Sequence, residues 1–209
     1  MLPMSRLSLE SPLDEYLAEI ERVRVLYKLK HTMRYLSVRD DTVHSESVAE
    51  HLYGMQVIAQ YFYPLEDPEG KLDRARVNEL ILLHEIGEIE TGDIINHRKT
   101  DEHRTEEKEA AKRVISQLPQ SMQKIALERH EEFEEHTTPE GKYAYTIDKV
   151  EPIFEMWDEA IALPLFKKFG YTYQNALDVK KEVTEEYPYM RRFVEAWESR
   201  AVALDIFPA

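Results

Sequence analysis

The residues best suited to chemistry lie in one short stretch, Leu83–Asp93, where an apolar helix ends in a histidine and several carboxylates. Adjacent His84 and Glu85 project about 100° apart around a helix, close enough to converge on one ion. Glu88 follows four residues after His84 and shares its face of a continuous helix. These residue types at this spacing predict a metal-binding and catalytic edge at the end of the helix.

Two other interpretations of the stretch stay open from the residues alone. A His-Glu pair at the end of a buried helix can be a hydrogen-bonded structural pair. The stretch can also be an altered metalloprotease signature, His-Glu-x-x-His, in which two imidazoles one turn apart hold zinc. Glu88 stands where that signature needs its second histidine, which counts against the protease interpretation.

Further candidate residues lie elsewhere in the chain. Asp148 is set among apolar residues of an expected helix, where an unpaired carboxylate costs on the order of several kcal/mol, so it needs a metal ion, Lys149 or a helix terminus as partner. His51, in the first turns of another helix, is either a partly exposed polar residue or a ligand. Arg34 and Tyr35 form either a phosphate clamp with an aromatic surface or a surface arginine beside a half-buried tyrosine.

The composition narrows the kinds of site and partner. The 209 residues include no cysteine, so a metal site must use histidine and carboxylate ligands. The formal net charge of −14 disfavours nucleic acid as a partner, and the common glycine-rich nucleotide loops are missing. No apolar run approaches the ~20 residues of a membrane span, and Met1–Leu7 lacks a signal-peptide core. We therefore expect a soluble, cytoplasmic protein.

Apolar residues at helical spacing, with caps before them, predict an all-α bundle of seven to nine helices. Ser11–Pro12 should start a helix that runs to about Lys30. A capping box at Ser47 starts another, which Pro64 is expected to break, and Asp73 can cap the next. The remaining helices are expected at about 102–117, 121–135, 139–157, 174–186 and 188–204.

In chain order, the candidates follow a known pattern: a histidine on one helix, a histidine-acid pair ending another, and a distant aspartate on a later one. The sequence resembles the HD-domain metal-dependent phosphohydrolases, and more closely their 5'-deoxynucleotidase branch. The matching segments are Leu29-Lys30-x-x-x-Arg34, Glu46-Ser47-Val48-Ala49-Glu50-His51, Leu82-Leu83-His84-Glu85-Ile86-Gly87-Glu88, Thr91-Gly92-Asp93-Ile94 and Ile147-Asp148-Lys149-Val150-Glu151-Pro152. The resemblance implies an HD-domain helical bundle in a single domain, 1–209, with a motif-bearing core at 26–160 and C-terminal helices at 161–209 packed on it.

The resemblance also implies one divalent ion (Mn, Co, Fe, Zn or Mg), with the ligands His51, His84, Glu85 and Asp148. The family's paired acid is Asp, and Glu85 departs from it by one methylene, which moves the carboxylate by roughly a bond length. Either the helix or the ion shifts to compensate, or the affinity for the ion falls.

The implied reaction is hydrolysis of (deoxy)ribonucleoside 5'-monophosphates to nucleoside and phosphate. Glu88 would position or deprotonate the attacking water, and Asp93 would orient the sugar or protonate the leaving group. Arg34 would bind phosphate, with Tyr35 as a stacking surface. A homodimer is usual in the family, and the apolar segment Phe193–Phe207 belongs either to its interface or to the core. Two alternatives stay open: a catalytically impaired relative acting as a binding or regulatory module, and a hydrolase of another nucleotide phosphoester.

Overall fold

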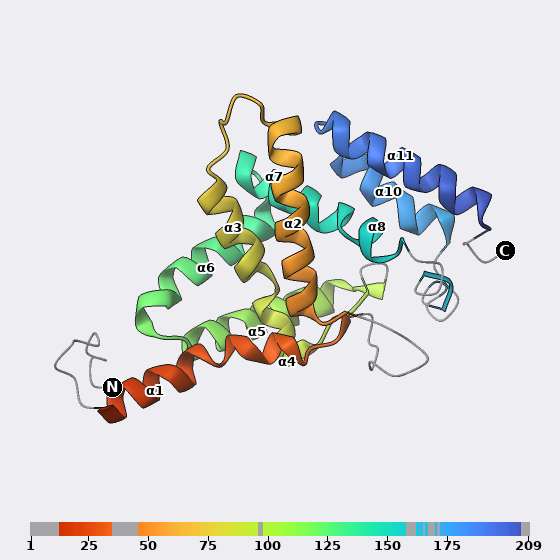
Figure 1. Ribbon diagram of the computed structural model, residues 1–209. Helices are drawn as coiled ribbons and strands as arrows, with labels where there is room; N and C mark the ends of the chain where they lie inside the picture. The colour runs from red at the N-terminus through yellow and green to blue at the C-terminus, as the bar shows by residue number, and fades with distance from the viewer. Residues whose placement is uncertain are drawn as a thin grey trace.

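The computed structural model describes residues 13–34, 46–95, 98–157, 162–164, 166, 170 and 172–205 (Figure 1). Helices joined by short turns and loops make up most of the described part of the chain, which confirms the predicted all-α bundle. The elements are α1 Leu13–Val23, η1 Leu26–Lys30, α2 Val48–Glu66, α3 Arg74–Leu83, η3 His84–Gly87, α4 Glu88–Thr91, α5 Asp101–Gln117, α6 Gln120–Glu135, α7 Pro139–Val150, α8 Pro152–Glu155, α10 Tyr173–Val183 and α11 Pro188–Ala203, where η marks a 3-10 helix.

The first expected helix is divided in two. α1 ends at Val23, and the tighter helix η1 follows at Leu26–Lys30. The apolar residues Val23, Leu26 and Leu29 recur every three positions, which is the period of a 3-10 helix. The prediction of one continuous helix to Lys30 was therefore wrong, and the break brings Leu29 into the core at 5% exposure.

Helix α2 stands in the middle of the bundle (Figure 1). Its predicted capping box is confirmed, because the Glu50 N–H donates to Ser47 Oγ and the Ser47 N–H donates to the Glu50 carboxylate. Pro64 does not break the helix as expected, and α2 continues to Glu66. The carbonyl that loses its donor at Pro64 is that of exposed Gln60, where water can replace the bond.

The predicted cap of α3 is also confirmed, since Asp73 accepts from the N–H groups of the first turn. α3 does not continue to Glu88 as an α-helix. Its last residue is Leu83, Glu85 adopts φ −92° and ψ 18°, and the short helix α4 starts at Glu88. Residues His84–Gly87 pack closely on α5, where a β-carbon on Gly87 would lie 2.6 Å from the Glu107 carbonyl oxygen. This break changes the directions in which the candidate ligands point.

Helix α7 begins at Pro139 as predicted and lies against α2, α3, α6 and α10. The two C-terminal helices α10 and α11 lie side by side at one edge of the bundle (Figure 1). Phe193 of α11 contacts Phe62 of α2, with ring centroids 5.1 Å apart, and Trp197 is buried. These two residues of the apolar C-terminal segment therefore belong to the core, whereas Ile206 and Phe207 lie outside the described residues.

None of the helices in the described ranges combines the length and the apolar character that crossing a membrane requires.

Candidate metal centre

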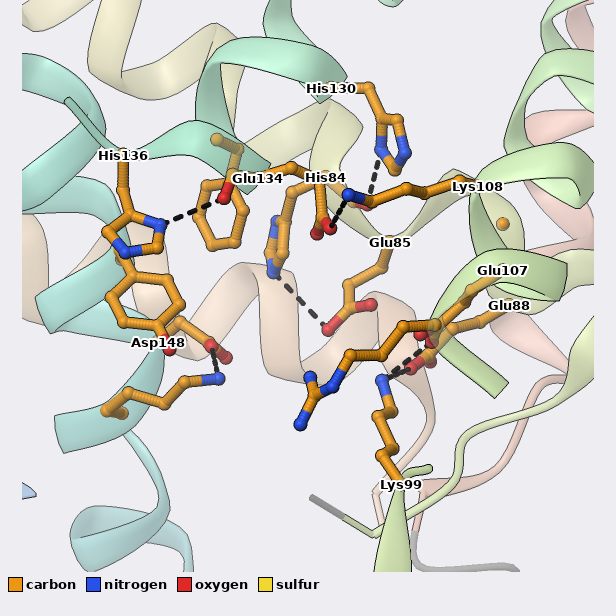
Figure 2. Close-up of a pocket in the computed structure, with 15 residues that line it drawn as sticks. His84, Glu85, Glu88, Lys99, Glu107, Lys108, His130, Glu134, His136 and Asp148 are labelled. Carbon is orange, nitrogen blue, oxygen red and sulfur yellow. Dashed lines mark hydrogen bonds and ion pairs between the residues drawn. The ribbon is translucent and has the colours of Figure 1, made fainter. Parts of the chain in front are cut away.

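The four predicted ligands come from three elements and meet in the interior. His51 comes from α2, His84 and Glu85 from η3, and Asp148 from α7. One donor atom of each lies within 4.8 Å of the others. Four donor atoms this close together could surround one divalent ion, whose bonds to nitrogen and oxygen ligands are about 2.1 Å long. Figure 2 shows three of the four, His84, Glu85 and Asp148, facing one hollow.

His84 is held in the orientation of a ligand. Its Nδ1–H donates to the Ile81 carbonyl oxygen at 2.9 Å, and its ring stacks on Phe133 with centroids 4.1 Å apart. The buried Nε2 has no hydrogen-bond partner among the described residues, and Glu85 Oε1 lies 3.3 Å from it. A buried nitrogen whose lone pair faces other ligand atoms fits a metal centre.

His51 is fully buried between the carboxylates of Asp148 in α7 and of Glu151, the residue that follows α7. Its Nε2 lies 3.0 Å from Asp148 Oδ1, and its Nδ1 lies 2.8 Å from Glu151 Oε2. Burial and Arg34 act to lower the pKa of His51, but the two carboxylates raise it to about 9. A divalent ion at Nε2 must therefore displace a proton.

Asp148 is buried and paired on two sides. Oδ1 faces His51, and Oδ2 accepts a hydrogen bond from Lys149 at 2.6 Å. The partner that the sequence required for this carboxylate is thus present, and Lys149 leaves Oδ1 directed at the other ligands. Both alternatives considered for Asp148, a lysine pair and a metal role, are compatible with this geometry.

Glu85 reaches the ligand set despite its extra methylene. Its backbone lies in the sparsely populated bridge region, outside helical geometry. The break after α3 therefore directs the longer side chain toward His84 and Asp148. The local backbone departs from a helix at the same residue at which the sequence departs from the family pattern.

Glu88 lies beside the ligand set. Its buried carboxylate groups with those of Glu85 and Glu107, and the Lys99 ammonium lies 3.8 Å from Glu88 and 2.6 Å from Glu107 (Figure 2). Burial and the carboxylates of Glu85 and Asp93 raise the pKa of Glu88 well above its ordinary value, while Lys99 acts in the opposite direction. Glu88 and His84 were expected to share one helix face, and this expectation was wrong, because the helix breaks between them. Glu88 lies instead with the carboxylates of Glu85 and Glu107.

The other predicted site residues occupy different surroundings. Asp93 is buried after Gly92, which has a φ of 70° that favours glycine. Arg34 contacts Glu46 and His51, and its Nη1 lies 3.5 Å from Glu151 Oε2. Tyr35 lies outside the described residues.

A cavity of about 260 Å³ adjoins the ligands (Figure 2). Along with His84, Glu85 and Asp148, its lining includes the cationic side chains of Lys99, Arg104, Lys108 and Lys149. Sequence reasoning named Lys149 as a possible partner of Asp148 and gave Lys99, Arg104 and Lys108 no role in the site. Arg104 and Lys108 carry no sequence signal, because only the packing of α5 against η3 brings them to the cavity.

The fold and the ligand set define an HD-domain protein. The model of the HD domain family matches residues 26–191, and the chain belongs to this family. The predicted family is thereby confirmed.

Among its relatives, the chain is similar to 5'-deoxynucleotidase HDDC2 of Homo sapiens, with 31% identity over 139 residues that cover 65% of each protein. It is also similar to 5'-deoxynucleotidase hdd1 of Schizosaccharomyces pombe, with 31% identity over 140 residues, 64% of this chain and 68% of that protein. The match thus spans less than two thirds of the human relative's length. A solved structure of a predicted metal-dependent phosphohydrolase from Magnetospirillum magnetotacticum MS-1 shares the fold, with a TM-score of 0.77, 22% identity and coverage of 93% and 98%.

Proposed function

We propose that the protein is a metal-dependent phosphohydrolase that converts (deoxy)ribonucleoside 5'-monophosphates to nucleoside and phosphate. The observation that carries the proposal is the convergence of His51, His84, Glu85 and Asp148 beside a cavity whose lining holds both carboxylates and the cationic side chains of Lys99, Arg104, Lys108 and Lys149. A divalent ion in the centre, together with these cationic side chains, would attract an anionic ligand to the cavity. The names of the human and yeast relatives support a nucleotide as that ligand.

The four ligands fit a divalent ion of the Mn, Co, Fe, Zn or Mg group, because two imidazoles and two carboxylates offer mixed nitrogen and oxygen donors. When bound, the ion supplies Lewis-acid stabilisation of the charge that develops on the phosphoryl group. Lys99, Arg104 and Lys149 bind the phosphate oxygens from the cavity wall.

Glu88 is the residue that positions or deprotonates the attacking water, since its carboxylate lies beside Glu85 on the same cavity. Asp93 orients the sugar hydroxyl or protonates the leaving group. Arg34 is our candidate to bind phosphate, and Tyr35 offers a stacking surface.

The test is phosphate release from a panel of deoxyribo- and ribonucleoside 5'-monophosphates with Mn²⁺, Co²⁺, Mg²⁺ or a chelator. We expect metal-dependent release, and a loss of about 10²- to 10⁴-fold in kcat for Glu88→Gln with the ion still bound. Glu106→Gln is the matched control, because Glu106 lies exposed on α5 and pairs with Arg113. Wild type that releases no phosphate from any monophosphate would refute the function, and full activity of Glu88→Gln would refute the role of Glu88.

We also propose that the protein forms a homodimer through α1 and the adjoining groove. Leu17, Ile20 and Val23 form an apolar stripe on α1 that is 38% to 63% exposed. It continues into a groove whose lining includes exposed Tyr53 and Leu82. An exposed apolar surface of this kind marks an interaction site. Sedimentation of the wild type should give the dimer mass and that of Leu17→Glu the monomer mass, and a monomeric wild type would contradict the proposal.

A further inference from the structure

The two carboxylates that hold His51 come from the last turn of α7 and from Glu151, which caps the C-terminus of that helix. Asp148 and Glu151 are three residues apart, so both project from the same side of the chain as α7 ends. Asp148 meets the ring at Nε2, 3.0 Å away, and Glu151 meets it at Nδ1, 2.8 Å away. The imidazole is thus held between them with no exposed surface.

The two ring nitrogens have different surroundings. Nε2 faces the donor atoms of His84, Glu85 and Asp148, so it is the nitrogen able to join an ion. Nδ1 faces Glu151, and a carboxylate can only accept, so the bond to Glu151 forms when Nδ1 carries a proton; Arg34 Nη1 contacts the same nitrogen. With Nε2 bound to an ion, the remaining proton would stay on Nδ1, and its bond to Glu151 would set the orientation of the ring.

The position of the Glu151 carboxylate depends on a glycine of α2. A β-carbon at Gly54 would lie 2.6 Å from Glu151 Oε1, closer than two such atoms can approach. Gly54 comes three residues after His51, on the same side of α2. The missing side chain at position 54 therefore leaves the space in which the Glu151 carboxylate reaches the ring.

The charge of this buried carboxylate is balanced nearby. Arg34 Nη1 lies 3.5 Å from Glu151 Oε2 and also contacts Glu46. Both Glu46 and Glu151 are buried, at 5% and 3% exposure. A carboxylate can be kept at this depth because a cation accompanies it.

We propose that Glu151 is a positioning residue that holds His51 for a divalent ion, and that Gly54 is the residue that admits Glu151. This inference rests on the metal centre of the proposed function. It concerns the affinity of the centre for its ion, because neither residue has a donor atom in the set of four ligands.

The experiment measures Mn²⁺ and Co²⁺ dissociation constants by competition with a chelator for the wild type, four single variants and one double variant. Glu151→Ala should weaken binding about 10- to 100-fold, as loss of a partner to a metal-bound histidine does. Glu151→Gln keeps a carbonyl acceptor for Nδ1–H and should recover most of this loss. Gly54→Ala should weaken binding about 10-fold by displacing the carboxylate. Gln60→Ala, at an exposed position of α2, is the control and should bind as the wild type does.

The double variant Gly54→Ala with Glu151→Ala separates the two residues. If Gly54 acts through Glu151, the double variant should bind no more weakly than Glu151→Ala alone. Thermal unfolding of each metal-free variant identifies losses that come from misfolding. The Co²⁺ absorption spectrum reports the ligand geometry and should change in Glu151→Ala.

Three results would overturn the inference. Wild-type affinity in folded Glu151→Ala would show that Glu151 does not position His51, and additive losses in the double variant would show that Gly54 acts independently. A wild type that binds neither Mn²⁺ nor Co²⁺ would show that the four candidate ligands do not form a metal centre. By contrast, a wild type that binds the ion and hydrolyses no monophosphate would refute only the proposed reaction.

Discussion

Replacing Glu85 by the shorter Asp, the acid of the family pattern, should weaken the metal centre. Glu85 lies in a non-helical turn, and its carboxylate reaches within 4.8 Å of the other three donor atoms. In Glu85→Asp the carboxylate withdraws by about 1.5 Å, the length of one carbon–carbon bond. Metal–ligand distances tolerate deviations of only about 0.2 Å, so the Asp must be carried forward by movement of the backbone.

The surroundings of η3 resist that movement. Gly87 is packed against the backbone of α5 so closely that a β-carbon would lie 2.6 Å from the Glu107 oxygen. On the other side, His84 is fixed by the Ile81 carbonyl and by Phe133. We therefore expect the dissociation constant for Mn²⁺ to rise about 10- to 100-fold, equivalent to about 1.4–2.8 kcal/mol.

The assay is a chelator competition with Mn²⁺, followed by phosphate release from deoxyribonucleoside monophosphates at saturating ion. Glu90→Asp is the matched control, because Glu90 lies exposed on α4 and pairs with Arg113, so its shortening should leave affinity within about 2-fold. Tighter binding together with faster hydrolysis in Glu85→Asp would refute the reasoning, since it would show that the natural Glu impairs an inherited aspartate site.

Two further predictions concern the packing and the loops that position the centre. Gly87→Ala should lower the free energy of unfolding by about 1–3 kcal/mol in urea titrations, because the new β-carbon overlaps α5; a variant as stable as wild type would contradict this close approach. Asp67→Asn should cost about 1 kcal/mol near neutral pH, because the Asp67 carboxylate accepts from the N–H groups of Lys71 and Leu72. Burial acts to raise the pKa of Asp67, but these bonds hold it below its ordinary value. Its contribution to stability is thus full above about pH 4 and is lost as the pH falls through the lowered pKa, so the wild type and Asp67→Asn curves should converge in acid.

The sequence predicted those elements whose signals are local. Ser47 and Asp73 cap their helices because the cap and the groups it bonds lie within a few residues of each other. The order of the motifs in the chain also predicted that His51, His84, Glu85 and Asp148 meet, and their donor atoms do lie together. Their role as metal ligands stays a prediction, as do the roles of Glu88, Asp93, Arg34 and Tyr35.

The break at Leu83 could not be predicted, because it depends on packing between distant segments. Apolar spacing continues through Leu83 as in a helix, and the contact of Gly87 with α5 involves a partner twenty residues away. Glu151 was different, since its spacing of three residues from Asp148 placed it on the ligand side of α7 from the start. The spacing alone gave Glu151 no role. The structure suggests one, because it places His51 between the carboxylates of Asp148 and Glu151.

Three of the four candidate ligands share one structural feature that would prepare them to bind an ion. In each of them a polar atom other than the donor is already bound: His84 Nδ1 to the Ile81 carbonyl, His51 Nδ1 to Glu151, and Asp148 Oδ2 to Lys149. Each bond fixes the rotamer that directs the remaining atom inward, so little side-chain entropy is left to lose when an ion binds. The outer partners come from α3, which holds Ile81, and from the end of α7, where Lys149 and Glu151 lie. Loss of any one of them should therefore weaken ion binding without unfolding the bundle, whereas loss of a ligand removes a bond to the ion itself.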